Sequence, residues 1–476
     1  MVDRRWASLF ACSLFACGGV GETLEGVDTS GETTSRTSGA DASTSAGDSS
    51  SSEAGDSTST SGELGSSEAS TGSEGGEETT GGLTTDACDE FDAFVEALPN
   101  EDDPAAAVAT FIREAQYGAH GLPLRCEDRV VFISTSEAPR SVAGDFNDWD
   151  PDALPMMVPV AGAPLQVADV ELAAPGGLYK FVENGTFIAD PLARRYGWDE
   201  FGEFSLVDAR VDARVDAGHH ERWPAFDGAI GELEPRTLRV FVPPALDAAT
   251  PTLLLHDGQN VFSPEALFGG WQASSTATAL VEDGAIVPVL LVAIDNTAAR
   301  LEEYSHVPDD IGGGALGGLG DAYADFVVDG VLPFLASRYG VALLPETTGV
   351  LGSSMGGLIS LHLAQRHPDV FGYAGSMSGT LGWGTFGLDN ETMQSRYLAD
   401  PPTGVVLYVD SGGGGPCPGG GSDNYCENVS FADALRGLGW ADDADLFYRW
   451  SPGAGHNEAA WAARLGAALR DWYPGG

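Results

Sequence analysis

A serine in a short glycine-flanked pattern is the first candidate for chemistry in this sequence. Residues 352–356 read GSSMG and fit the pattern G-x-S-x-G. An apolar stretch that predicts a strand at 348–351 precedes them, and a predicted helix at 358–366 follows. Small neighbours let the serine of such a strand-to-helix turn adopt a strained backbone that exposes its hydroxyl. Ser354 is therefore the candidate nucleophile for acyl transfer.

The serine needs a base, because a hydroxyl is a weak nucleophile near neutral pH. In this arrangement the chain order is Ser, then Asp or Glu, then His. The histidines after Ser354 are His362, His367 and His456. The first two belong to the helix that leads away from the nucleophile. His456 follows the last predicted strand, at 446–450, and we expect it to be the base.

The acid that orients the base should follow the predicted strand at 405–409, where Asp410, Asp423 and Glu427 are candidates. Asp410 ends the strand, where a structural hydrogen bond would be a sensible role for it. Asp423 lies between two cysteines, and a disulfide there would fix the loop that presents it. We favour Asp423, and Asp410 and Glu427 remain alternatives.

The oxyanion of a tetrahedral intermediate needs backbone N–H donors. Met355, the residue after the nucleophile, should supply one. The other should come from the loop after the predicted strand at 252–255, which begins HDGQN. Gly258 lets that loop turn, and we assign the second donor to the N–H of Gln259. This chemistry requires no metal and no organic cofactor, and we expect none.

The elements that must position these residues lie in the C-terminal half. Strands alternating with longer helical stretches predict an α/β fold with a doubly wound, mostly parallel sheet over residues 232–476. The predicted strands are 238–242, 252–255, 289–294, 348–351, 405–409 and 446–450, and the predicted helices are 325–339, 358–366 and 458–473.

A smaller β-rich part precedes this half. Residues 86–125 form a short helical segment, with a helix expected from 104 to 115, and residues 211–231 form a linker. Between them, residues 126–210 predict a small immunoglobulin-like β-sandwich with a hairpin turn at Asn184-Gly185. Its predicted strands are 130–133, 141–143, 165–172, 178–182 and 186–189.

The first 85 residues predict export. Two arginines precede an apolar run at 6–16 that is too short to span a bilayer, so residues 1–16 read as a signal peptide. Residues 14–18, LFACG, resemble a bacterial lipobox, which predicts lipidation of Cys17; an ordinary signal peptide is the alternative. Residues 17–85 are rich in Ser, Thr, Gly and acidic residues, which predicts a disordered tether. We expect an exported lipoprotein at the cell surface or in the periplasm, with membrane contact only through the lipid.

Four further cysteines follow the signal region, an even number that is typical of disulfides in an exported protein. Of the three possible pairings, we favour the two local ones, Cys88 with Cys126 and Cys417 with Cys426. The chain has no CxxC or CxxH spacing that would favour a metal site.

The charge balance excludes one class of partner. The chain has 71 acidic and 23 basic residues and a formal charge of −48. Such a surface repels phosphate backbones, so we expect no nucleic-acid partner. The sequence leaves the oligomeric state open.

The predicted sandwich resembles the family 48 carbohydrate-binding module through the sequences VAGDFNDWDP, YKF and ADP at residues 142–151, 179–181 and 189–191. The resemblance implies that Trp149 and Trp198 could stack on sugar rings. The alternative is that Phe146 and Trp149 are core residues and that the module only packs on the next domain.

The C-terminal half resembles the esterase D and enterochelin esterase family of α/β-hydrolases. The resemblance rests on LLLHDGQN at 253–260, AIDN at 293–296, EY at 303–304, GSSMGG at 352–357, HPDVF at 367–371 and HNE at 456–458. It implies a serine carboxylic ester hydrolase acting through an acyl-enzyme, on a siderophore ester or a feruloyl or acetyl polysaccharide ester. The alternatives are an acyltransferase of the same fold and a carbohydrate-binding surface lipoprotein with an idle hydrolase domain. Arg300 and Glu303, near the site, could contact the substrate, but we favour a surface ion pair between them.

Overall fold

The structure is a computed structural model, and it describes residues 87–118, 121–126, 128–172, 177–207, 218–228, 233–417 and 421–476. The predicted signal peptide, the lipidation at Cys17 and the tether at 17–85 lie outside the described residues. Within the described ranges, no helix is long and apolar enough to cross a membrane.

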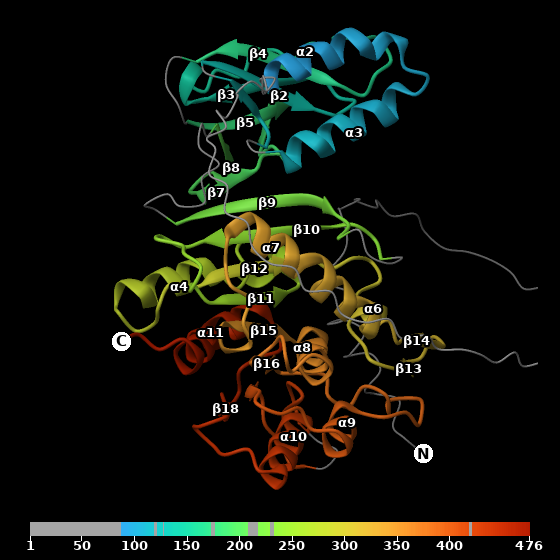
Figure 1. Cartoon of the computed structure of the whole chain (residues 1–476), viewed down its shortest axis with the longest axis vertical. Coiled ribbons are helices and arrows are strands. Elements are labelled where there is room, and N and C mark those ends of the chain that lie inside the picture. The colour runs from blue at the N-terminus through green and yellow to red at the C-terminus, as the bar shows by residue number, and fades with distance from the viewer. Residues whose placement is uncertain are drawn as a thin grey trace, which may run out of the picture. The chain divides into compact units, whose positions relative to one another are not determined.

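A parallel sheet forms the centre of the C-terminal half (Figure 1). Its strands follow the order β18-β17-β16-β15-β11-β12, each parallel to its neighbours, and the antiparallel β10 pairs with β12. The strands are β10 (Arg236–Val242), β11 (Thr252–His256), β12 (Leu290–Ile294), β15 (Thr348–Ser353), β16 (Tyr373–Met377), β17 (Val406–Ser411) and β18 (Leu446–Trp450).

Helices cover both faces of this sheet. Leu254 of β11 is buried in a core with helices α6 to α10, while its neighbours Leu253 and Leu255 are buried in a second core with α4 and α11. This alternation confirms the predicted doubly wound, mostly parallel α/β fold. The helices are α4 (Ala273–Glu282), α6 (Gly320–Asp325), α7 (Leu332–Tyr339), α8 (Met355–Arg366), α9 (Met393–Ala399), α10 (Tyr425–Leu438) and α11 (Glu458–Trp472).

The helix predicted at 325–339 is interrupted. Helix α6 ends at Asp325, a π-helical turn spans Phe326–Val331, and α7 begins at Leu332. Pro333, in the first turn of α7, has no N–H to donate, and its ring would collide with the carbonyl of the preceding α-helical turn. The wider π turn avoids that collision.

Two sheets face each other in the N-terminal part. Val130 and Phe132 of β2 share a buried cluster with Tyr179 and Phe181 of β5. One sheet holds β1 (Leu124–Cys126), β2 (Arg129–Ser134) and β4 (Gln166–Glu171), and the other holds β3 (Arg140–Gly144), β5 (Leu178–Glu183), β6 (Thr186–Ile188), β7 (Arg195–Asp199) and β8 (Gly202–Leu206). Helices α2 (Ala87–Ala97) and α3 (Pro104–Tyr117) lie beside the first sheet (Figure 1) and share a core with its other face.

The turn and the helix predicted in this part are present. Asn184 and Gly185 have φ angles of 51° and 77°, as a two-residue hairpin turn between β5 and β6 requires. Helix α3 begins at Pro104, and Asp103 caps it by accepting the N–H of Ala106. Cys88 and Cys126 are joined by a disulfide, which ties α2 to β1.

The expected linker at 211–231 contains a strand. Strand β9 (His219–Phe226) pairs with β7 on one side and β10 on the other, so one 13-stranded sheet runs from the N-terminal part through the C-terminal half. Sequence analysis did not predict this strand, because several of its residues are polar. Glu221 is nevertheless buried, and the hydroxyl of Tyr339 donates a hydrogen bond to its carboxylate, which offsets the cost of burial. The predicted domain boundaries themselves stay a prediction.

Candidate active site

Ser354 occupies a strained turn between β15 and α8. Its φ and ψ angles are 56° and −122°, which an L-residue rarely adopts. A Cβ at Gly352 would lie 2.5 Å from the backbone of Gly356, and a Cβ at Gly357 would lie 2.5 Å from Ser376 Oγ. Glycine is therefore required at 352, the first position of the pattern, and at 357, just after it, while a Cβ at Gly356 would meet His256 and Asp257 at 3.3 Å.

The two predicted oxyanion donors lie at the same end of the sheet. Met355 begins α8, where the first N–H groups of a helix have no acceptor within the helix. The loop after β11 reaches this point, because a Cβ at Gly356 would lie 3.3 Å from Asp257 Oδ2. Outside the bonds within helices, neither Met355 nor Gln259 donates its N–H to a backbone acceptor in the described part of the chain. The two N–H groups stay the expected oxyanion donors.

His456 and Asp423 are in contact. His456 lies in the loop between β18 and α11, and its Nδ1 is 2.7 Å from Asp423 Oδ1. The Asp423 carboxylate is buried, and its other oxygen accepts the hydroxyl of Ser378 at 2.7 Å and the N–H of Gly412. Nδ1 therefore carries the proton, and Nε2 is left to accept one.

Ser378 connects Asp423 to helix α11. The Ser378 hydroxyl accepts from Trp461 Nε1 at 3.2 Å and from Arg464 Nη2 at 2.8 Å, so its own proton is directed to Asp423. The ring of Trp461 also meets the ring of His456 edge to face, with centroids 5.0 Å apart. Acid and base are thus both oriented by buried residues in the first turns of one helix.

The two alternative acids face other partners. Asp410 accepts Arg464 Nε at 3.0 Å and the hydroxyl of Tyr408 at 3.1 Å, and burial raises its pKa to about 6. Glu427 accepts the N–H of Gly382 at 2.8 Å. The geometry therefore favours Asp423 as the partner of His456, and Asp410 fills the structural role considered for it.

Sequence reasoning missed Thr380. Its hydroxyl lies 3.3 Å from the Ser354 hydroxyl, and its N–H donates to the Ser354 carbonyl at 3.1 Å. Thr380 follows β16, a strand that sequence reasoning did not predict, so the chain gave no signal that this residue would reach the nucleophile.

A family model matches the C-terminal half of the sequence. The model, described as "Putative esterase", covers residues 233–472, just over half of the chain. The chain belongs to this esterase family. A curated relative of this esterase, the uncharacterized protein YbbA of Bacillus subtilis (strain 168), is 26% identical over 153 residues. The match covers 30% of the esterase, and it spans only 57% of the length of YbbA.

Solved structures are also similar to this esterase. The enterobactin esterase Fes of Shigella flexneri is 18% identical with a TM-score of 0.42, and the match covers 75% of this esterase and 97% of Fes. A ferulic acid esterase is 19% identical with a TM-score of 0.40, over 53% of this esterase and 97% of that chain. The predicted resemblance to esterases of the α/β-hydrolase fold is confirmed by the family match, whereas the likeness of the N-terminal part to a carbohydrate-binding module stays a prediction.

Arg300 and Glu303 do not form the expected surface ion pair. In this esterase, Arg300 makes two hydrogen bonds to Asp257, at 2.6 and 2.8 Å, and Glu303 makes two to Arg236, at 2.6 and 3.0 Å. Glu303 ends the short helix α5 (Arg300–Glu303), and both Glu303 and Arg236 are buried. The Arg300–Asp257 pair holds the loop that precedes Gln259.

Cys417 and Cys426 are joined across the loop that carries Asp423. Replacing both by serine should lower kcat about tenfold, because a loosened loop presents the acid less well. The matched control replaces Cys88 and Cys126, which are remote in the fold, and should lower the melting temperature but leave kcat unchanged. Ester hydrolysis and thermal unfolding measure both effects. Equal kcat in the two variants would contradict a role of the disulfide in presenting Asp423.

Glu427 makes the stability of this esterase depend on pH. Burial raises its pKa from 4.5 to about 7, so the folded state binds the proton more tightly than the unfolded state. The stabilisation is complete below about pH 4.5 and is lost as the pH rises through about 7. Glu427→Gln mimics the protonated form, so at about pH 8 it should unfold with a free energy about 1 to 3 kcal/mol above wild type.

Urea unfolding of the Glu427→Gln variant at about pH 5 and pH 8 tests this, because the difference should shrink at the lower pH. Asp433→Asn, an exposed change on the same helix, is the control. A difference that is the same at both pH values would show that the ionisation of Glu427 is not its cause.

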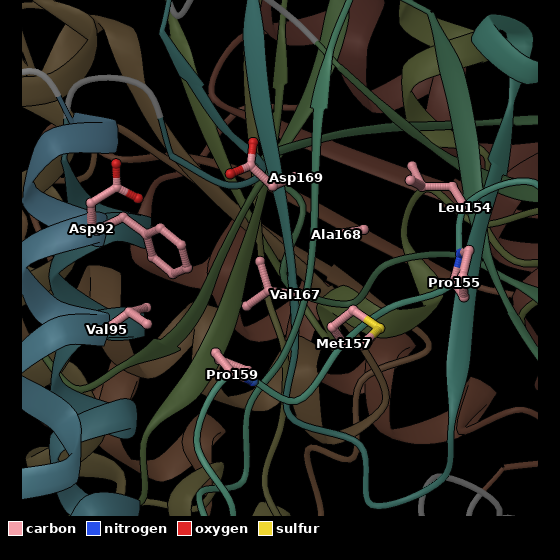
Figure 2. Close-up of a pocket in the computed structure, with 10 residues that line it drawn as sticks. Asp92, Val95, Leu154, Pro155, Met157, Pro159, Val167, Ala168 and Asp169 are labelled. Atoms are coloured by element: carbon pink, nitrogen blue, oxygen red, sulfur yellow. The ribbon is translucent and has the colours of Figure 1, made fainter.

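Figure 2 shows a pocket of about 410 Å³ in the N-terminal part of this esterase, between α2, β4 and the loop at 154–159. None of its lining residues is a predicted site residue, and its aromatic residue, Phe91, is buried. The residues expected to stack on sugars lie elsewhere. Trp198 packs on Tyr196 and His220, with ring centroids 5.2 Å apart in both pairs. The ring is half-buried, and sugar stacking on Trp149 and Trp198 stays a prediction.

Proposed function

We propose that the chain is a serine carboxylic ester hydrolase that acts through an acyl-enzyme on Ser354. The observation that carries the proposal is the positive φ of Ser354 at the turn between β15 and α8, because such strain persists where function requires it. The contact between His456 and Asp423, on loops that follow strands of the same sheet, supports it.

In the proposed mechanism, His456 Nε2 accepts the proton of the Ser354 hydroxyl as Oγ attacks the ester carbonyl carbon. The N–H groups of Met355 and Gln259 bind the oxyanion. The alcohol leaves with the proton from His456. Water then attacks the acyl carbon, and the carboxylic acid is released from Ser354. Asp423 holds Nδ1–H throughout and stabilises the imidazolium.

The substrate class we propose follows the resemblance stated above: a siderophore ester, or a feruloyl or acetyl ester of a polysaccharide. We also propose that the chain is exported and held at a membrane by a lipid on Cys17, as the lipobox-like sequence at 14–18 indicates. A role of the N-terminal part in binding the saccharide portion of the substrate belongs to the same proposal.

The experiment that tests the proposal combines turnover with active-site labelling. The full chain is incubated with p-nitrophenyl acetate and, separately, with a fluorophosphonate, and the labelled peptide is mapped by mass spectrometry. We expect turnover and a single adduct, on Ser354. An adduct elsewhere, or no turnover by folded protein, would contradict the proposal. Feruloyl, acetyl-polysaccharide and trilactone esters then separate the substrate classes, and an ester of an added alcohol among the products would indicate acyl transfer.

A further inference from the structure

Thr380 is fixed against the candidate nucleophile by two hydrogen bonds. Its N–H donates to the Ser354 carbonyl at 3.1 Å, and its Oγ1 lies 3.3 Å from Ser354 Oγ. Thr380 is 2% exposed, so solvent does not compete for its hydroxyl. The mechanism described above does not use this group.

Asn424 determines which way the Thr380 hydroxyl can point. The Asn424 side chain lies 2.9 Å from the carbonyl of Ser378, which can only accept, so Asn424 presents its NH₂ group there. The same nitrogen lies 3.4 Å from Thr380 Oγ1. Because Asn424 donates to Thr380, the proton of the Thr380 hydroxyl remains available for Ser354 Oγ.

In the acyl-enzyme, the hydrogen bond between Thr380 and Ser354 Oγ can form in one direction only. Once Ser354 is acylated, its Oγ carries no hydrogen and can only accept. The contact with Thr380 then persists as a hydrogen bond only if Thr380 donates, and the contact with Asn424 leaves it free to do so.

We propose that Thr380 is a catalytic residue of deacylation that donates a hydrogen bond to Ser354 Oγ as this oxygen becomes the leaving group. The inference rests on the proposed function, in which Ser354 is the nucleophile. Water attacks the acyl carbon and gives a proton to His456; the bond between that carbon and Oγ then breaks, and His456 returns the proton to Oγ. Thr380 transfers no proton, but its hydrogen bond stabilises the charge that develops on Oγ.

In acylation the same hydrogen bond is already made to the Ser354 hydroxyl of the free protein, which is a better acceptor than the ester oxygen of the acyl-enzyme, so it stabilises the ground state as well as the transition state. Removing the hydroxyl should therefore slow deacylation and spare acylation. The expected loss is about tenfold in the deacylation rate constant, as for one hydrogen bond to an oxygen with partial charge.

The test compares Thr380→Val, which keeps the shape and removes the hydroxyl, with Thr380→Ser, which keeps the hydroxyl. Acylation is measured as kcat/KM for p-nitrophenyl acetate. Deacylation is measured by acid-quenching acetylated protein at intervals and following the acetyl adduct on Ser354 by intact mass. We expect Thr380→Val to hold its adduct about ten times longer with kcat/KM within about twofold of wild type, and Thr380→Ser to restore the wild-type decay.

Two results would overturn the inference. One is an unchanged decay in Thr380→Val, and the other is a loss of kcat/KM as large as the loss in deacylation, which would mean that Thr380 only supports the turn. If the valine variant is misfolded by circular dichroism, Thr380→Ala is measured in the same way. A wild type that neither hydrolyses p-nitrophenyl acetate nor takes a fluorophosphonate adduct on Ser354 would refute the proposed function itself, which is a distinguishable outcome.

Discussion

Replacing Ser354 by alanine should lower kcat for p-nitrophenyl esters by about 10⁴- to 10⁶-fold while the protein stays folded. The alanine removes the attacking oxygen, and no other described hydroxyl occupies the turn between β15 and α8 in the same conformation. The residual rate would come from water attack on an ester held by the N–H groups of Met355 and Gln259. Steady-state hydrolysis and thermal unfolding, measured side by side, check both parts.

Ser353 provides the matched control for this variant. It precedes the candidate nucleophile directly and is also buried, but it belongs to β15 and has no role in the proposed mechanism. Ser353→Ala should retain activity. Ser354→Ala combined with His456→Ala should be no less active than Ser354→Ala alone, because residues that act as a unit lose their effect together. Comparable losses in the Ser353 and Ser354 variants would refute the assignment of the nucleophile.

The nucleophile and the base could be predicted from the sequence, because a local pattern and the chain order identify them. The turn at Ser354 needs glycine at fixed positions such as Gly352. The pattern G-x-S-x-G can therefore be recognised within five consecutive residues. His456 could be selected because chain order excludes the histidines before Ser354, and His362 and His367 belong to the helix after the nucleophile. The structure places His362 on α8, with its Nε2 2.9 Å from Asp321 Oδ1, which agrees with that exclusion.

The acid and its supports depend on contacts between distant segments. Asp410 lies near the end of β17, and Asp423 and Glu427 follow this strand. Their roles separate only through Arg464, His456 and Gly382, which come from other elements. Contacts between distant segments produce no recognisable pattern in the sequence. The sequence therefore left three candidates for the acid.

Strand β16 was not predicted because its three middle residues, at 374–376, are Ala, Gly and Ser. Gly375 lies where a Cβ would be 2.3 Å from Leu351 and 2.7 Å from Trp472, so packing requires glycine in the middle of this strand. Glycine normally argues against a strand. The residues that β16 carries to the site, Ser378 and Thr380, were missed with it.

Strand β9 was missed for the opposite reason. Its large polar residues have the composition of an exposed linker, but Glu221 and Arg222 are buried. Arg222 is paired with Glu203 of β8, and its guanidinium lies 4.0 Å from the centroid of the Tyr196 ring. Partners from neighbouring strands thus offset the cost of burying these charges, and the sequence pattern does not contain that information.

The contacts of Asp423 determine how the side-chain amide of an asparagine at this position would be oriented. One carboxylate oxygen, Oδ2, is surrounded by donors: the Ser378 hydroxyl, the Gly412 N–H and, at 3.8 Å, Arg464. The amide NH₂ of Asp423→Asn cannot face these donors, so it must take the place of Oδ1, opposite His456 Nδ1.

Asp423→Asn should therefore lower kcat by about 10⁴-fold without a large loss of stability. An NH₂ group opposite Nδ1 makes Nδ1 the acceptor and places the imidazole proton on Nε2, so His456 cannot accept the proton of Ser354. Asp410→Asn and Glu427→Gln, which keep the shapes of the alternative acids, should retain activity, because neither carboxylate contacts His456. Hydrolysis of p-nitrophenyl acetate and urea unfolding of the three variants decide the assignment: if Asp410→Asn or Glu427→Gln loses as much kcat as Asp423→Asn, the acid is not Asp423.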